Sequence, residues 1–414
     1  MSHTVSNLTH SEGARVVSTG SGATASLSFR DAAPMEWDRT EGWRYFTDPG
    51  EVYEADGAWY LTSREAVQFA HRHPELFSSA RAFDSLGSPV PLVPIASDPP
   101  EHVRYRRTLD PMLAPRVINR MEDELRQQVN DLIDGFVERG SCEVIGDLAK
   151  PFPTQVILTL FGLPLEDRDR FFSWNQKILE ITGGKAGEPT PDQMDAALAM
   201  FEYMQGFIDR KRSVAGDDML SSVLALKGDD AWSNEEVLGL CFLVALAGLD
   251  TVTASIGFAL MHLSKRPDLR QRMVDDPSSR SGLIEEVLRL EVPAALTPRV
   301  TTKDVVVGGE TIPAGSYVFL VLGAVNRGAE WGENANEINL DAADRGHLTF
   351  GGGIHRCLGS HLARRELRIV VEEFHKLIPE YEIAPGFEPE VVWPAGTLHL
   401  KSLPFVFPAV GELS

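Results

Sequence analysis

The longest apolar stretch of the chain extends from Val237 to Leu263 and contains scarcely a charged residue. The residues before it, Ser233 to Glu236, have the form of a capping box, which predicts the start of a helix. A helix of this length could cross a membrane, but Asp250 and several hydroxyl residues lie near its middle. A helix that is apolar on all sides is also expected at the centre of a large core. We therefore predict a buried central helix.

Other segments repeat apolar residues with a helical period. They predict helices over Ser63–His71 with Ser63 as N-cap, from Pro99 onward, and over Arg120–Gly140, Thr154–Phe161, Leu165–Ile181 and Asp192–Lys211. Alternating residues predict strands between Trp37 and Thr62, between Leu296 and Leu322, and near the C-terminus, with a hairpin turn at Gly308-Gly309. The predicted fold class is mainly α with a smaller β-rich region, an α+β protein.

Composition narrows the class of protein. The chain has 414 residues, 43% hydrophobic and 24% charged, as in an ordinary globular protein. A net charge of -21 argues against nucleic acid as a partner. Cys142, Cys241 and Cys357 lie far apart, without a disulfide pattern, which favours a reducing compartment. Residues 1–28 are rich in Ser, Thr and Gly and lack the features of a signal peptide. We expect a disordered leader at 1–28, a single domain at 29–414, and a soluble cytoplasmic monomer.

The segment from Phe350 to Gly359 is a glycine-rich loop that presents Cys357 before an amphipathic helix. Glycines allow the backbone to approach a flat, bulky group closely. Amides of a first helical turn would stabilise a thiolate at Cys357, and a single thiolate suits haem iron. The alternatives are a buried structural cysteine and a zinc site with His355 and His361. The zinc site lacks the second pair of cysteines that structural zinc normally uses.

Inside the apolar stretch, Ala247 to Thr251 carries candidate chemistry. Gly248 costs a helix roughly 1 kcal/mol relative to alanine, and a small residue there would let the helix open locally beside a pocket. Asp250 next to Thr251 forms a candidate proton-delivery pair. The alternative is that Thr251 bonds back to the carbonyl four residues earlier. A buried Asp250 needs a polar partner under either interpretation.

Two further charged pairs stand at helical spacing. Glu286 and Arg289, at i and i+3, can pair on one helix face. His102 and Arg106, at i and i+4, share a face and could clamp anionic groups. The alternative for each pair is a solvated surface.

The spacing of Phe350, Gly353, Cys357 and Gly359 resembles the haem loop of cytochrome P450 monooxygenases. Five motifs between Asp98 and Phe407 occur in the order of that family. The resemblance implies the P450 fold, a long buried central helix over haem b, with Cys357 as iron ligand. It assigns haem contacts to His102, Arg106, Ala247, Gly248, Arg299, Phe350, Gly351, His355 and Gly359. Asp250 and Thr251 would be the catalytic pair, and Glu286 with Arg289 a structural core pair whose third partner is in doubt, because Asn339 stands near the expected aromatic residue.

The implied reaction inserts one atom of O2 into a C–H bond. Electrons would come from NAD(P)H through a ferredoxin and its reductase, because the chain carries no flavin or iron–sulfur fingerprint. A group of basic residues would dock the acidic ferredoxin. Its members are Arg104, Arg107, Arg356, Arg364 and Arg365.

The expected substrate pocket carries no charged side chain, which favours an apolar substrate such as a terpenoid or branched lipid. Its candidate residues are Leu92, Val93, Leu243, Ala247, Ala295, Leu296, Gly396 and Thr397. Steroids and fatty acids are alternative substrates. A haem protein that binds or senses a ligand without turnover, and a haem enzyme of the same fold that uses peroxide or isomerises its substrate, are alternative functions.

Overall fold

The computed structural model describes residues 28–83, 88, 90–182, 190–214, 216–340, 346–393 and 397–409. The predicted leader lies outside these residues except for Ser28. Its disorder and the extent of the domain stay predictions.

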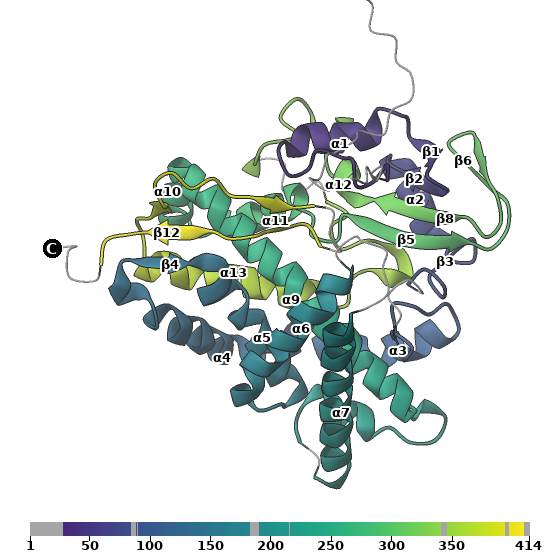
Figure 1. Ribbon diagram of the computed structural model, residues 1–414, viewed down its shortest axis with the longest axis horizontal. Helices are drawn as coiled ribbons and strands as arrows, with labels where there is room; N and C mark the ends of the chain where they lie inside the picture. The colour runs from purple at the N-terminus through teal and green to yellow at the C-terminus, as the bar shows by residue number, and fades with distance from the viewer. Residues whose placement is uncertain are drawn as a thin grey trace, which may run out of the picture.

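Helix α9, Asn234–Lys265, runs through the middle of the molecule (Figure 1). The Ser233 hydroxyl accepts a hydrogen bond from the Glu236 amide at 3.1 Å, and the Glu236 carboxylate accepts one from the Ser233 amide at 2.7 Å, so the predicted capping box is confirmed. By length and composition the helix could cross a membrane, yet 61% of its most apolar window is buried inside the structure. The predicted buried central helix is therefore confirmed.

Helices surround α9 on several sides (Figure 1). Those that pack on it directly include α5 and α13. The helices are α1 (Arg39–Thr47), α2 (Arg64–Arg72), α3 (Glu101–Leu109), α4 (Pro115–Asp134), α5 (Pro151–Phe161), α6 (Arg168–Thr182), α7 (Pro191–Ser213), α8 (Met219–Leu224), α10 (Pro267–Asp275), α11 (Ser279–Leu290), α12 (Leu322–Val325) and α13 (Ser360–Leu377).

The main sheet has the strand order β1-β2-β8-β5-β3, with β2 and β8 parallel and the other neighbours antiparallel. Its strands are β1 (Val52–Ala55), β2 (Ala58–Leu61), β3 (Phe77–Ser78), β5 (Leu296–Thr301) and β8 (Tyr317–Val321). The smaller sheets are β4 (Ser141–Glu143) with β12 (Pro404–Val406) and β9 (Glu382–Ile383), β6 (Val305–Val307) with β7 (Glu310–Ile312), and β10 (Val391–Val392) with β11 (His399–Leu400). The predicted α+β class is confirmed.

Local signals proved reliable at turns and caps. Ser63 caps α2 by accepting from the Ala66 amide at 3.2 Å. Gly308 and Gly309 have φ of 60° and 88° and join β6 to β7, as a two-residue hairpin with positive φ at both positions requires.

Two predictions of element bounds were wrong. Arg39–Thr47 is helix α1 and not part of a strand-rich segment, because Asp38 caps it by accepting from the Thr40 and Glu41 amides. The helix predicted over Arg120–Gly140 spans Pro115–Asp134, because a proline opens it.

Candidate active site

Cys357 lies at the end of the glycine loop, three residues before α13 begins at Ser360. Its amide donates to the Phe350 carbonyl at 2.8 Å, which closes the loop on itself. Cys357 is exposed, whereas Cys142 and Cys241 are buried. Of the three thiols, only that of Cys357 is therefore available to a ligand.

The glycines of this loop have a protein neighbour that the sequence did not reveal. A Cβ on Gly353 would overlap the His71 carbonyl oxygen and lie 2.9 Å from its carbonyl carbon, and φ at Gly353 is 60°. A Cβ on Gly352 would lie 2.7 Å from His71 Nδ1. We expected these glycines to serve close approach to a flat group. At Gly352 and Gly353 they serve the packing of the loop against the end of α2.

Opposing effects act on the pKa of the Cys357 thiol. Although part of its surface is exposed, the protein atoms packed around Cys357 reduce its solvation and raise its pKa, while the Gly359 amide and nearby Arg106, Arg364 and Arg356 act to lower it. We predicted that amides of a first helical turn would stabilise a thiolate here. The Gly359 amide, which precedes α13, acts in that direction, but the loss of solvation outweighs it and the pKa is raised. A metal ion that binds the thiolate would shift this balance, because it competes with the proton for sulfur.

The centre of α9 is unbroken over Ala247–Thr251. Ala247 is exposed although most of α9 is buried, so the surface of the helix is uncovered at that point. Gly248 has a different neighbour: a Cβ there would lie 3.0 Å from Ile157 Cδ1 of α5. The predicted local opening of the helix at Gly248 is therefore wrong, because close packing of α5 accounts for this glycine. Its contact with a cofactor stays a prediction.

Thr251 donates its hydroxyl hydrogen to the Ala247 carbonyl at 2.8 Å, the back-bond considered as the alternative. The hydroxyl oxygen keeps the capacity to accept a hydrogen bond.

Asp250 has the partner that its burial required. Asn175 Nδ2 of α6 donates to its carboxylate at 3.3 Å. Burial raises the pKa of Asp250, and the charges of His399 and Lys150 act against that rise. Three polar groups, from α6, from β11 and from the residue before α5, thus surround this carboxylate. The sequence offered no signal for Asn175, His399 or Lys150, because they are remote along the chain.

A cluster of cationic and imidazole groups lies beside the glycine loop. The His102 and His355 rings are tilted by 56° with ring centres 4.3 Å apart, and the buried Nε2 of each has no hydrogen-bond partner among the described residues. Burial, followed by the charge of Arg299, lowers the pKa of His355 to about 2 and that of His71 to about 4. Arg106 reaches the same loop, donating to the Arg356 carbonyl at 2.7 Å. His71 was not predicted.

Arg299 is the cation of this cluster with the least compensation. It is 5% exposed, burial lowers its pKa to about 10, and within the described part of the chain its hydrogen bond goes to the Pro298 carbonyl at 2.6 Å. The charge of Asp98 acts to hold the pKa up. A buried cation with donors to spare, beside two imidazole nitrogens without partners, is suited to anionic groups such as carboxylates.

Glu286 and Arg289 form the predicted pair inside the core. The question of the third partner is answered by backbone: Arg289 donates to the carbonyls of Asn326, Ala335 and Glu337 at 2.7 to 2.9 Å. The Asn339 amide donates to Glu286 at 2.8 Å, and the Trp331 ring lies 4.6 Å from the Arg289 guanidinium. Asn339 therefore contributes through its backbone amide, which any residue other than proline could supply.

The predicted pocket residues lie on segments that meet in pairs. The Pro91 carbonyl of the Leu92–Val93 segment touches α9 at Gly239, and the Leu398 amide beside Thr397 donates to the Pro293 carbonyl at 2.9 Å, next to Ala295 and Leu296. Leu92, Val93 and Ala295 are buried, and Leu243, Leu296 and Thr397 are half-buried. Gly396 lies outside the described residues.

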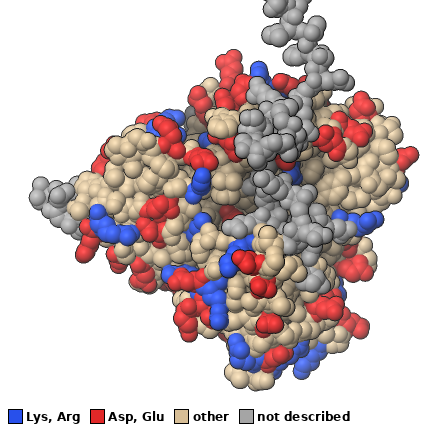
Figure 2. Space-filling view, in the orientation of Figure 1, with Lys and Arg blue, Asp and Glu red and all other residues tan. Residues whose placement is uncertain are grey.

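The predicted basic surface is largely neutralised within the chain. Arg104 pairs with Glu236, Arg107 with Asp230, Arg365 with Glu122, and Arg364 with Glu285 at 2.6 Å. Acidic side chains also spread among the basic ones over the face seen in Figure 2. Arg356 is exposed, and no ion pair is recorded for it among the described residues. The group is thus less positive than its sequence suggests.

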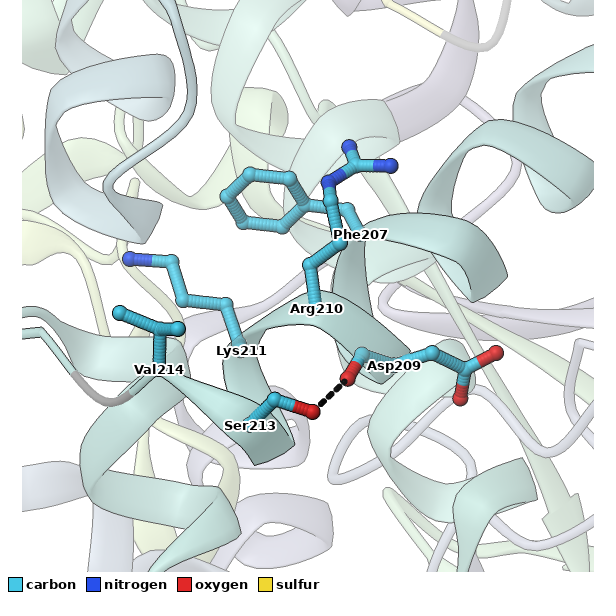
Figure 3. Close-up of a pocket in the computed structure, with 6 residues that line it drawn as sticks. All are labelled: Phe207, Asp209, Arg210, Lys211, Ser213 and Val214. Carbon is cyan, nitrogen blue, oxygen red and sulfur yellow. Dashed lines mark hydrogen bonds between the residues drawn. The ribbon is translucent and has the colours of Figure 1, made fainter.

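Two hollows lie elsewhere. One, of about 640 Å³, borders the end of α7 and is lined by Phe207, Asp209, Arg210, Lys211, Ser213 and Val214, as Figure 3 shows. It contains none of the predicted site residues. The other, of about 190 Å³, lies between α4, α11 and α13 and includes His361 and Arg364.

Within the described residues no group of three or more His, Cys, Asp or Glu side chains is placed to hold a metal, so the zinc alternative finds no support.

Taken together, the residues fit an anionic, flat cofactor that takes one thiolate ligand. The available thiol of Cys357, the exposed Ala247 on a buried helix and the orphaned imidazole nitrogens beside Arg299 are the features that a haem with its two carboxylates requires. The fold and the site thus fit a haem-thiolate protein.

Comparison with known proteins agrees. A sequence model described as cytochrome P450 matches residues 281–390. The chain is 32% identical over 364 residues to cytochrome P450 130 of Mycobacterium tuberculosis, covering 84% of this chain and 88% of the relative. It is 33% identical over 350 residues to the vitamin D(3) 25-hydroxylase of Pseudonocardia autotrophica, covering 82% and 85%. The structure of CYP109E1 from Bacillus megaterium in complex with testosterone superposes with a TM-score of 0.81 at 26% identity, covering 90% of this chain and 98% of that one.

The chain therefore belongs to the cytochrome P450 family and is a monooxygenase that uses haem as its cofactor.

Proposed function

We propose that the chain hydroxylates an apolar small molecule of terpenoid or branched-lipid type, with O2 and electrons from NAD(P)H delivered by a ferredoxin and its reductase. The observation that carries the site assignment is the exposure of Cys357 among three cysteines of which the other two are buried. Cys357 is the proposed iron ligand, and the bound haem supplies the oxygen chemistry.

His102, Arg106, Arg299 and His355 would hold the two haem carboxylates. Support comes from the adjacent imidazoles, whose Nε2 atoms have no partner among the described residues, and from the buried Arg299 guanidinium. Ala247, Gly248, Phe350, Gly351 and Gly359 would lie along the macrocycle. The Arg364 guanidinium lies 4.3 Å from the Phe350 ring centre and would fix that ring beside the loop.

Thr251 and Asp250 would deliver protons from the protein side. Thr251 holds its hydroxyl hydrogen on the Ala247 carbonyl and can accept a hydrogen bond from water. Asp250, whose pKa burial raises, can take up and release a proton nearer neutral pH than an exposed aspartate can. This proton path favours a monooxygenase over a sensor or a peroxide-using enzyme, neither of which needs it.

The apolar substrate is supported by the candidate pocket residues, all without charge, and by the names of two relatives that refer to vitamin D(3) and to testosterone. The second of these keeps a steroid as the alternative substrate.

The ferredoxin would dock near α3 and the glycine loop, where Arg107 and Arg356 are exposed cations. Arg364 is unsuited to a test of this docking, because it binds Glu285. Arg356→Glu should slow electron transfer from an acidic ferredoxin, with greater loss at low salt. Arg272→Glu on α10 is the control. Equal rates in wild type and Arg356→Glu would contradict the docking site.

We also propose that the protein is soluble, cytoplasmic and monomeric. Gel filtration tests the monomeric state.

The central experiment is the carbon monoxide difference spectrum of the dithionite-reduced protein. Wild type should show the red-shifted Soret band of thiolate ligation, and Cys357→Ala should lose it. Cys142→Ala, which removes a buried thiol in β4, is the matched control and should keep the band. A band that persists in Cys357→Ala would overturn the assignment.

A further inference from the structure

Gly239 of α9 is in contact with a distant backbone segment. A Cβ at this position would overlap the Pro91 carbonyl oxygen and lie 3.0 Å from its carbonyl carbon. Both atoms belong to main chain, so no side-chain rotation can relieve the overlap. A glycine inside a helix costs stability relative to alanine, and this contact supplies the reason for it.

The segment on Gly239 is anchored and ordered. Leu92 is 3% exposed and Val93 is 1% exposed, so both side chains belong to the core. The Val93 amide donates to the Pro91 carbonyl at 3.0 Å, and the Ala96 amide donates to the Leu92 carbonyl at 2.9 Å. The Pro91 carbonyl therefore both bonds within the segment and rests on the helix, which ties the position of residues 91–93 to Gly239.

The position of this contact along α9 gives it a role. Gly239, Leu243 and Ala247 follow one another at intervals of four, so they lie along one side of the helix. Their exposure rises in that order: Gly239 is buried, Leu243 is half-buried and Ala247 is exposed. The side of α9 that is uncovered at Ala247 is thus covered at Gly239, where the Pro91 carbonyl contacts the helix.

From this arrangement we infer that Gly239 is a specificity-determining position: by lacking a side chain it lets residues 91–93 rest on α9 and close one end of the substrate pocket, which limits the length of the apolar substrate. The inference rests on the proposed function, because it assigns the space beside Leu243 and Ala247 to the substrate. A side chain at residue 239 would lift the segment and lengthen the pocket.

The test compares Gly239→Ala with Gly257→Ala. The control is the same substitution in the same helix, but its new Cβ would meet Ile145 Cδ1 at 2.7 Å, the movable end of a side chain, and it does not touch residues 91–93. Hydrogen exchange is measured on the holoproteins at the Val93 and Ala96 amides. We expect roughly tenfold faster exchange in Gly239→Ala and wild-type rates in Gly257→Ala.

Ligand size is read with two probes that bind haem iron, imidazole and 4-phenylimidazole, by the shift of the Soret band. In Gly239→Ala the ratio of their dissociation constants should move roughly tenfold in favour of the larger probe, with imidazole affinity unchanged. In Gly257→Ala the ratio should equal that of wild type. An unchanged or reversed ratio in a folded Gly239→Ala protein, or the same change in the control, overturns the inference.

Two further measurements distinguish a failure of this inference from a failure of the variant to fold and from a failure of the proposed function. If Gly239→Ala does not fold, Leu92→Ala removes the buried anchor of the segment instead and should move the ratio in the same direction, and an unchanged ratio there overturns the inference. If wild type binds neither imidazole nor carbon monoxide at a haem, the proposed function fails, while exchange at Val93 and Ala96 still decides whether Gly239 positions the segment.

Discussion

The Arg289 guanidinium and the Glu286 carboxylate form a two-point ion pair, with both N–O distances 2.8 Å and each side chain 1% exposed. Arg289 also donates to three backbone carbonyls and lies against the Trp331 ring. The pair thus joins α11 to the segment that precedes the glycine loop.

Removing either partner should destabilise the fold strongly, because an unpaired charge is left in the interior. We expect Glu286→Ala or Arg289→Ala to lower the free energy of unfolding by about 3–5 kcal/mol in urea titrations. The double variant should lose less than the sum. Glu41→Ala, which breaks an exposed pair with Arg44, is the control and should change stability by less than about 1 kcal/mol. Additive losses would show that the two residues act independently.

Asp250→Asn should reduce product formation by roughly 10²–10⁴-fold while the carbon monoxide spectrum stays that of wild type, because only proton delivery is removed.

Asn175→Ala should change how the rate of product formation depends on pH. Loss of the Asn175 donor removes a bond to the charged carboxylate, so the pKa of Asp250, already raised by burial, should rise further.

If ionised Asp250 is the active form, the acidic limb of the rate profile should then move to higher pH in Asn175→Ala. The exposed neighbour Gln176 provides the control, and Gln176→Ala should keep the wild-type profile. If the pH–rate profiles of wild type, Asn175→Ala and Gln176→Ala are identical, Asn175 does not influence the function of Asp250.

Arg299→Met should have opposite effects on the two forms of the protein. Burial lowers the pKa of Arg299 to about 10, so at neutral pH the cation is charged and costs the haem-free protein stability, and the variant should be more stable in denaturant. The haem-loaded variant should release haem to apomyoglobin at least roughly tenfold faster, because an anionic group loses its cation. Arg107→Met, at an exposed cation, should change neither quantity. Unaltered haem release would remove Arg299 from the haem site.

Acid should destabilise the fold partly through Glu291. Burial acts to raise its pKa, but Arg39 at 3.0 Å and His262 at 2.8 Å outweigh this and hold the pKa at about 2. The folded value lies below the unfolded one, so this carboxylate stabilises the fold above about pH 4.5, and its contribution is lost as the pH falls toward 2. The difference in unfolding free energy between wild type and Glu291→Gln should be constant at neutral pH and should shrink below pH 4.5. A difference that does not vary with pH would contradict this role.

Local patterns in the sequence predicted much of the fold and the chemistry. The capping box at Ser233, the cap at Ser63 and the hairpin at Gly308-Gly309 depend on contacts within four residues, so neighbouring letters determine them. The same holds for the position of Cys357 before α13 and for the pairing of Glu286 with Arg289, three residues apart.

The partners that contact these residues from distant parts of the chain were decided by the tertiary structure alone. Asn175 reaches Asp250 across 75 positions, and Pro91 rests on Gly239 across 148. The need for glycine at positions 248 and 353 is explained by close contacts with Ile157 and His71, respectively, and neither of these residues belongs to a motif. Such contacts depend on how helices and loops pack, which local periodicity does not specify. The sequence by itself thus determined the candidate reactive residues and most elements, and packing determined their partners and their burial.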